Sequence, residues 1–416
     1  MNSELVASVR AAVDRERLVE TACDLVAIPS FTGDEYACAE YLLGEFDSIG
    51  LESTFQLVEE GRANAIGRWR GVGEGRHLMF NGHLDTSYSG EEDWLDGPGF
   101  KPQPLVRDET ILGLGIMNMK GAVACYVEAV RALQDCGISL SGDLIVAGVA
   151  GEIEKSQWDR EYVGPEYRGY GSGTAYLLTH GVLADACVLG EPTEEKIALG
   201  HFGSLWGRIS TSGPFIHTAF SSGRSEENSI IRMRRVIERI EEWVPEWETQ
   251  AAYRGMPAAA NLGAISGGFP WRASRTPHRT DLFLDIRVPP SMPMMEAVRA
   301  FYSLVRQLDG EFPEMGLTSE IYVTVPGSEI DPSHPLVGII EESHRDAAGT
   351  TPATDYVRWG SDASALTRHG VASVNYGPIS SGLPGPEGES VPIDSLVRMA
   401  TSYALIATRF CGVDMT

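Results

Sequence analysis

Four short β-rich runs in the first half of the chain constrain its fold more than any other feature. They are "ANAIGRW" (63–69), "HLMFNGHLD" (77–85), "DLIVAGVAGE" (143–152) and "ACVLGEP" (186–192). Helical patterns lie between them, and the clearest is "MKGAVACYVEAVRALQDCG", whose apolar residues recur at helical spacing until Gly137 ends the pattern. Strands that alternate with helices predict an α/β domain built on a mostly parallel, helix-covered sheet.

The pattern changes near residue 204 and changes back near residue 326. The middle segment has the order strand "LWGRISTSG", helix "SIIRMRRVIERIEEW", strands "AANLGAIS" and "DLFLDIRVPP", helix "MEAVRAFYSLVRQL" and strand "SEIYVTV". That order resembles a ferredoxin-like α+β unit with its own small sheet. We therefore expect a main domain in two parts, 1–203 and 326–416, and an inserted domain at 204–325.

Charge and hydropathy exclude several classes of partner. The chain has 58 acidic and 33 basic residues, and this balance argues against nucleic acid or an anionic membrane as the main partner. No run reaches the roughly 18 apolar residues of a membrane span, and the first residues lack the apolar core of a signal peptide. We expect a cytoplasmic protein that acts on a small molecule.

Polar residues follow the predicted strands at their C-terminal ends, where open α/β sheets place their sites. His83 and Asp85 end one strand, Glu152 follows the next, and Glu191 follows the third. Two residues apart, His83 and Asp85 share a face, so the Asp85 carboxylate can orient the imidazole of a metal-binding histidine. A histidine with several carboxylates on one rim is suited to a divalent metal.

Asn118 lies at the centre of "GLGIMNMKG", a glycine-rich turn that leads into a helix. Taken alone it is a turn residue, because Asn tolerates left-handed backbone conformations. A lone H-x-D or a lone Glu after a strand is equally weak, and only the order of all these residues together indicates a site.

That order resembles the metallohydrolase family of aminoacylases, acetylornithine deacetylases, succinyl-diaminopimelate desuccinylases and glutamate carboxypeptidases. The resemblance includes "LDIRVPP" and "GSDASALTRHG" and extends over almost the whole chain. It implies a homodimer that pairs through the inserted domain. It also implies two zinc-like ions: one bound by the H-x-D histidine and the Glu of G-E-P, the other by a Glu after the catalytic Glu and a C-terminal histidine. An aspartate before Met-Lys-Gly bridges them.

Three departures from the family pattern fall together. Asn118 replaces the bridging aspartate, Ile153 follows the base Glu152, and Gly385 stands at the place of the C-terminal histidine, while Glu389 keeps the acid of that motif. Two cations about 3.5 to 4 Å apart need an anionic bridge, and an amide supplies no charge.

We therefore predict one divalent transition metal per subunit, zinc or manganese, held by His83, Asn118 and Glu191. Glu152 is the predicted base on metal-bound water, and Asp85 orients His83. An alternative registration makes Glu154 the displaced ligand.

Several further residues are candidates for contact with the substrate. His217 matches the family's lid histidine, which polarises the scissile group, and Arg287 in "LDIRVPP" matches a lid arginine, although a structural ion pair is an equal interpretation. The loop "PWRASRTPHR" contains Arg272 and Arg275, which suit a substrate carboxylate, whereas a charge run usually marks a solvated surface.

The chain also inserts "KSQWDREYVGPEYRGY" after Glu152, with Trp158, Tyr162, Tyr167 and Tyr170. These aromatic residues either cover the domain surface or line a pocket for a flat substrate.

These features predict a metal-dependent hydrolase that cleaves a carbon–nitrogen bond of a small carboxylate-bearing molecule. Two chemistries compete: amide hydrolysis, and hydrolytic removal of an aromatic amino group, as in the family's 5-nitroanthranilate aminohydrolase. The alternative from another class is a catalytically dead relative that serves as a binding or assembly module.

Overall fold

The computed structural model describes residues 3–156, 169–380 and 385–413. The chain divides into two compact units. The first comprises Met1–Gly200, Glu329–Tyr356 and Ser361–Thr416, and the second comprises His201–Ser328 and Val357–Gly360. The domain boundaries expected from the sequence, at residues 203 and 325, stay a prediction.

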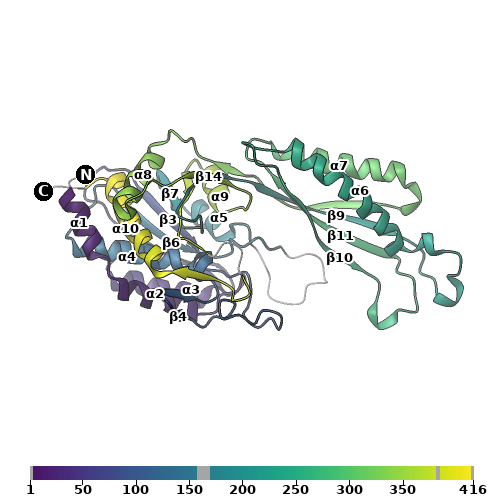
Figure 1. The fold of residues 1–416 in the computed structure, drawn as a ribbon, viewed down its shortest axis with the longest axis horizontal. Helices are drawn as coiled ribbons and strands as arrows, with labels where there is room; N and C mark the ends of the chain where they lie inside the picture. The colour runs from purple at the N-terminus through teal and green to yellow at the C-terminus, as the bar shows by residue number, and fades with distance from the viewer. Residues whose placement is uncertain (1–2, 157–168, 381–384, 414–416) are drawn as a thin grey trace. The chain divides into compact units, whose positions relative to one another are not determined.

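A large sheet forms the centre of the first unit (Figure 1). Its strands, in spatial order, are β1 (Glu52–Glu59), β2 (Arg62–Trp69), β6 (Leu144–Val149), β3 (Leu78–His83), β7 (Ala186–Leu189), β15 (Ala372–Asn375), β8 (Ile197–His201) and β13 (Ser328–Glu329), and β14 (Thr354–Val357) pairs with β8. The four central strands β6, β3, β7 and β15 run parallel. The pairs β1–β2, β2–β6 and β15–β8 are antiparallel. The predicted α/β fold is confirmed, with antiparallel pairing towards the edges of the sheet.

Helices cover both faces of this sheet, as predicted (Figure 1). The larger core lies under α1 (Ser3–Ala12), α2 (Arg15–Ala27), α3 (Tyr36–Ser48), α4 (Gly121–Asp135), α8 (Pro335–Ala348) and α10 (Ile393–Cys411). The smaller core lies under α5 (Ser172–Thr179) and α9 (Ala363–Arg368). Helix α4 is apolar on nearly every side because it packs between the sheet and other helices.

A small second sheet in this unit joins β16 (Ser390–Pro392), β5 (Thr110–Leu112) and β4 (Leu105–Arg107). It brings the C-terminal segment beside the turn that contains Asn118, because β16 pairs with β5 and β5 directly precedes that turn. Sequence-distant segments thus meet at one end of the unit.

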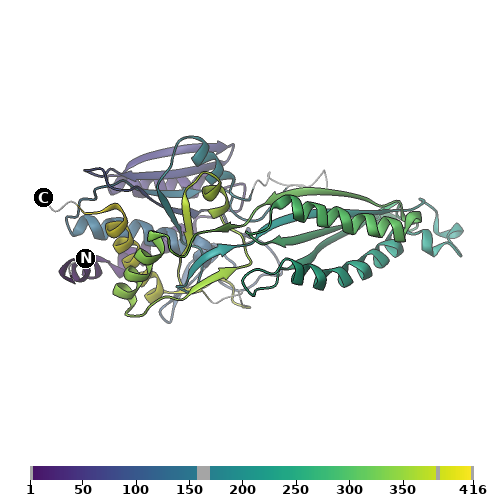
Figure 2. The same ribbon diagram turned by 90° about the horizontal axis from the view of Figure 1, so that it is seen from above.

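The second unit has the ferredoxin-like order predicted from the sequence. Its elements are β9 (Gly203–Ser212), α6 (Ser229–Gln250), β10 (Ala260–Gly267), β11 (Arg279–Val288), α7 (Met294–Glu311) and β12 (Thr318–Val325). The strands pair antiparallel in the order β10–β11–β9–β12, and both helices lie against the sheet (Figure 2). Leu282, Leu284 and Ile286 alternate along β11 and are buried against the helices, as a strand with one covered face requires.

None of the helices in the described parts of the chain combines the length and the apolar character that crossing a membrane requires.

Candidate metal centre

Three neighbouring parallel strands bring His83, Glu152 and Glu191 together. His83 is the last residue of β3, which lies between β6 and β7, and Glu152 and Glu191 follow those two strands. Parallel neighbours end at the same edge of a sheet, so residues that follow them meet there. One nitrogen or oxygen atom from each residue lies within 4.8 Å of the other two. Within the described ranges no other group of His, Cys, Asp and Glu side chains is this close.

Distances in this cluster fit a divalent metal. His83 Nε2 lies 3.0 Å from Asn118 Oδ1, 3.8 Å from Glu152 Oε2 and 3.8 Å from Glu191 Oε1. Ligand atoms that bind zinc at about 2.0 to 2.2 Å are separated from each other by roughly 3 to 3.5 Å. Glu191 Oε1 is buried and has no hydrogen-bond partner among the described residues, so this oxygen is available to bind an ion.

The His83 imidazole is oriented for this role. Its Nδ1 lies 2.9 Å from the backbone oxygen of Asp85 and 3.5 Å from that residue's Oδ1. Nδ1–H can donate to the backbone carbonyl, and Nε2 then faces the cluster, where a proton or a metal ion can occupy it.

The Asp85 carboxylate also binds the backbone beside Glu152. Oδ1 accepts from the backbone N–H of Glu152 at 3.0 Å, and Oδ2 accepts from that of Ile153 at 3.1 Å and from the Thr32 hydroxyl at 2.8 Å. It thereby fixes the turn that presents Glu152, in addition to lying beside the imidazole as predicted.

Buried charges perturb each group of the cluster. Burial alone would lower the pKa of His83, but Asp85, Glu191 and Glu152 raise it well above its usual value. Burial and the neighbouring Glu191 raise the pKa of Glu152 strongly, and burial raises the pKa of Glu191 to about 7. Burial alone would raise the pKa of Asp85, but hydrogen bonds and the charge of His83 outweigh this effect and lower the pKa to about 2. Protons and a metal ion therefore compete for this cluster.

Comparison with known proteins identifies the family. Residues 79–409 match the model of Peptidase family M20/M25/M40. The chain belongs to this family. The match places it among hydrolases and confirms the resemblance found in the sequence.

Named relatives cover most of this M20 chain. It is 24% identical over 400 residues to a succinyl-diaminopimelate desuccinylase from Gluconacetobacter diazotrophicus, covering 94% of this chain and 96% of the relative. It is 24% identical over 386 residues to the N-formyl-4-amino-5-aminomethyl-2-methylpyrimidine deformylase of Bacillus subtilis, with coverage of 86% and 85%. An acetylornithine deacetylase from Vibrio parahaemolyticus is 26% identical over 332 residues, 79% of this chain and 81% of that protein.

Solved structures share the fold. A tripeptidase from Staphylococcus aureus superposes with a TM-score of 0.75 at 20% identity, covering 96% of this chain and 99% of that one. The dipeptidase Dug1p from Saccharomyces cerevisiae gives the same TM-score at 13% identity, with 99% coverage of both chains.

The turn that presents Asn118 is held by Glu389. Glu389 Oε2 accepts from the backbone N–H groups of Gly115, Met117 and Asn118 at 3.0, 3.1 and 3.3 Å. The peptide bond between Asn118 and Met119 is cis. Burial raises the pKa of Glu389 to about 7, although the three N–H groups oppose that rise. The acid retained from the family's C-terminal motif thus anchors the turn of a predicted ligand.

We expect Glu389→Ala to destabilise the protein by about 3 kcal/mol, because three buried or part-buried N–H groups lose their acceptor. Glu389→Gln keeps a carbonyl oxygen and should be close to wild type. Because the folded-state pKa is raised, wild type should lose stability relative to Glu389→Gln as pH rises from about 4.5 through 7. Urea denaturation of the three proteins at several pH values measures both effects, and an Ala variant as stable as wild type contradicts the anchoring role.

The other departures from the family pattern supply no ligand to the cluster. Ile153 is buried, and its backbone N–H is bound by Asp85. Glu154, the alternative ligand, is not a member of the close group, and Gly385 has no side chain to offer.

Asp362 is an acidic residue of this region that sequence reasoning did not select. It precedes α9 and is 2% exposed; its Oδ2 accepts from the Thr174 hydroxyl at 2.6 Å, and Thr174 accepts from Asn81 Nδ2 at 3.0 Å. Oδ1 has no hydrogen-bond partner among the described residues. Burial raises the pKa of Asp362 to about 6, and its charge raises the pKa of both Glu152 and Glu191. The motif "GSDASALTRHG", which contains Asp362, was the only sequence feature that indicated this residue.

We expect Asp362→Asn to weaken metal binding by about tenfold, the equivalent of one pKa unit of electrostatic interaction. The amide keeps the size of the side chain and its contact with Thr174 but removes a negative charge near the cluster. Competition with a chromogenic chelator measures the affinity.

Asp143→Asn is the matched control, because Asp143 is a buried acid at the opposite end of β6. Equal affinities of Asp362→Asn and wild type would contradict an electrostatic role.

The predicted lid residues all belong to the second unit. His217 Nδ1 accepts from the backbone N–H of Ala219 at 3.1 Å, so the neutral imidazole has its proton on Nε2 and can donate a hydrogen bond from that nitrogen. Arg287 pairs with Asp285 on the same strand at 2.8 Å, which favours the structural interpretation of this arginine. His217 and Arg275 lie opposite each other in an antiparallel bridge, and Arg272 is exposed.

Hydrogen bonds join the two ends of the aromatic insertion next to Glu152, the predicted base. The backbone N–H of Tyr170 donates to the carbonyl oxygen of Glu152 at 3.1 Å, and that of Gly169 donates to Lys155 at 3.2 Å. Trp158, Tyr162 and Tyr167, which we expected to cover a surface or line a pocket, lie outside the described residues.

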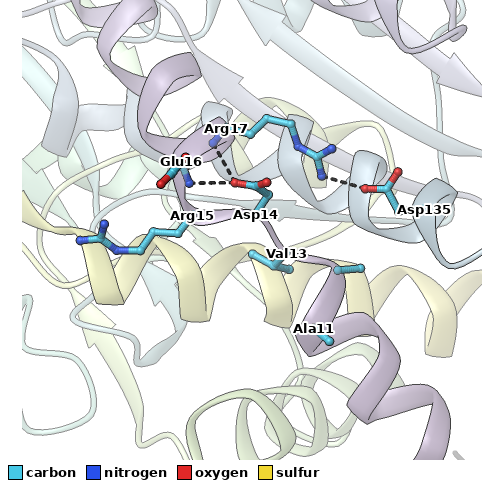
Figure 3. Close-up of a pocket in the computed structure, with 8 residues that line it drawn as sticks. Ala11, Val13, Asp14, Arg15, Glu16, Arg17 and Asp135 are labelled. Atoms are coloured by element: carbon cyan, nitrogen blue, oxygen red, sulfur yellow. Dashed lines mark hydrogen bonds and ion pairs between the residues drawn. The ribbon is translucent and has the colours of Figure 1, made fainter.

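A hollow of about 580 Å³ lies elsewhere in the first unit, where α1 meets α2 (Figure 3). Asp14, Arg17 and Asp135, which line it, already have partners. Asp14 accepts from the backbone N–H groups of Glu16 and Arg17, and the Arg17 guanidinium pairs with Asp135 and Glu128. This hollow is a charged junction between helices.

Proposed function

We propose that this chain is a single-metal hydrolase that cleaves an amide bond in a small carboxylate-bearing molecule. The cluster of His83, Glu152 and Glu191 is the observation that supports it most, together with Asn118 in place of a bridging acid. The named relatives support the bond type, since a desuccinylase, a deacetylase and a deformylase each remove an acyl group.

His83, Asn118 and Glu191 would hold the metal, zinc or manganese. When bound, such an ion polarises a carbonyl group and lowers the pKa of water. Residues of the chain carry out the proton transfers and bind the substrate.

Glu152 takes a proton from the attacking water and returns it to the leaving nitrogen. Its buried position raises its pKa, which suits a group that must both accept and release a proton near neutral pH. Asp85 holds the backbone of Glu152 and Ile153 in place during this transfer.

His217 donates a hydrogen bond from its Nε2–H to the oxygen on which negative charge develops, and we propose that the partner subunit of a homodimer paired through the second unit supplies this histidine. Arg272 and Arg275 of the second unit bind the substrate carboxylate.

A panel of substrates tests this function. Metal-loaded protein is incubated with N-succinyl, N-acetyl and N-formyl amino acids and with aminobenzoates, and the release of carboxylate and of ammonia is measured separately. Carboxylate release from an N-acyl amino acid is the expected result. Ammonia release from an aminobenzoate without any acyl release would show aromatic deamination instead, and no turnover of either class would favour the catalytically dead alternative.

A further inference from the structure

Two loops of the second unit, residues 213–224 and 268–278, are joined by hydrogen bonds. The backbone N–H of Thr218 donates to Ser274 at 2.9 Å, and that of Thr276 donates to Ile216 at 2.9 Å. His217 and Arg275 form an antiparallel bridge between these bonds. Residues directly opposite in such a pair project their side chains to the same side. The side chains of His217 and Arg275 therefore lie on the same side of this pair of loops.

Exposed aromatic rings surround this pair. Phe215, two residues before His217, is 47% exposed, and Phe269 and Trp271 on the other loop are 40% and 77% exposed. The Phe215 and Phe269 rings meet edge to face with centroids 6.4 Å apart, and Phe269 contacts Trp271 at 5.5 Å. Aromatic rings gathered at an exposed position are typical of a binding surface.

Arg275 lies over the Phe215 ring of this cluster and forms no ion pair with a carboxylate of the described residues. Its guanidinium carbon is 5.2 Å from the centroid of the Phe215 ring. Its Nε is buried and has no hydrogen-bond partner within the described residues, and no described carboxylate forms an ion pair with it. Arg279 and Arg287, also in this unit, each pair with an aspartate.

We propose that Arg275, Phe215 and Phe269 form a recognition site for an aromatic carboxylate. A guanidinium stacked on a ring keeps its N–H edge for two parallel hydrogen bonds to a carboxylate. The phenyl rings offer flat apolar surface to the aromatic part of the same ligand. The chain has a net charge of -25, so Arg275 is a local positive group in an acidic protein. Its charge is complementary to that of a carboxylate ligand.

This inference rests on the proposed function in one point. The recognition site contacts the substrate only if His217, which lies beside it, acts at the scissile bond. It then narrows the substrate class to amides of aromatic acids, such as N-acyl aminobenzoates or N-acyl aromatic amino acids. Binding itself needs neither metal nor turnover.

Binding of benzoate to the metal-free full-length protein tests the site without catalysis. Titration calorimetry compares benzoate with benzamide, which lacks the charge, and with cyclohexanecarboxylate, which lacks the flat ring. We expect benzoate to bind at least tenfold more tightly than either. Arg275→Gln should weaken benzoate at least tenfold and leave benzamide unchanged, and Phe215→Leu should remove the preference for benzoate over cyclohexanecarboxylate. Arg234→Gln, an exposed arginine of α6, is the matched control.

Three results would overturn the proposal. The first is that wild type shows no preference for benzoate over benzamide, and the second is that Arg275→Gln binds benzoate as wild type does. The third is that sedimentation velocity shows conversion of a dimer to a monomer by Arg275→Gln and Phe215→Leu while benzoate binding is unchanged, which identifies the cluster as a subunit contact. Turnover of N-acetylglycine and of N-acetylphenylalanine by the metal-loaded protein is measured in parallel. If either compound is hydrolysed while benzoate discrimination fails, only the recognition site is wrong; if neither is hydrolysed, the proposed function fails separately.

Discussion

Glu152→Gln is expected to lower kcat by roughly three orders of magnitude, within the range typical of a lost general base. The amide keeps the size of the side chain but cannot take a proton from water. Because His83, Asn118 and Glu191 are the proposed ligands, the variant should still bind metal. Steady-state kinetics at saturating substrate, with the metal content determined on the same sample by mass spectrometry, measures both properties.

This variant also separates two roles for Glu152, whose Oε2 lies only 3.8 Å from His83 Nε2. Loss of metal together with activity would make Glu152 a ligand instead of the base. Unchanged activity would show that Glu152 is not the base, whereas the dead alternative requires that wild type itself has no turnover. Glu154→Gln is tested beside it, and loss of metal from that variant would show that the alternative registration is right.

His83→Ala should weaken metal binding by at least about 100-fold, because it removes the one nitrogen ligand of the proposed set and leaves two oxygen donors. A ligand that binds only the folded state stabilises it, so metal should raise the melting temperature of wild type and leave that of His83→Ala unchanged. Thermal unfolding with and without added zinc or manganese measures this difference.

His180→Ala is the control, because His180 is an exposed histidine at the end of α5. An equal metal-dependent shift in His83→Ala and wild type would show that the ion binds elsewhere.

Local sequence patterns were sufficient to predict the architecture. Alternating apolar runs and helical spacing predicted the parallel strands and the inserted ferredoxin-like unit, and the structure confirms both. The meeting of His83, Glu152 and Glu191 also followed from position, since each residue ends or follows a strand and those strands are neighbours. Their chemical roles stay predictions.

Long-range contacts could not be predicted from the sequence. Glu389 binds the turn at Gly115, 274 residues earlier, and no local pattern indicates that pairing. Asp362 meets Thr174 across 188 residues for the same reason. The hydrogen bond from His83 Nδ1 to the backbone of Asp85 depends on the exact path of the chain after β3, which residue spacing does not specify.

The number of metal ions per chain tests the central claim most directly. Protein is loaded with zinc or with manganese, freed of excess ion by gel filtration and measured by mass spectrometry against the protein concentration. We predict one ion per chain in wild type and none in His83→Ala. Two ions per chain would contradict a site reduced to a single metal by Asn118, Ile153 and Gly385.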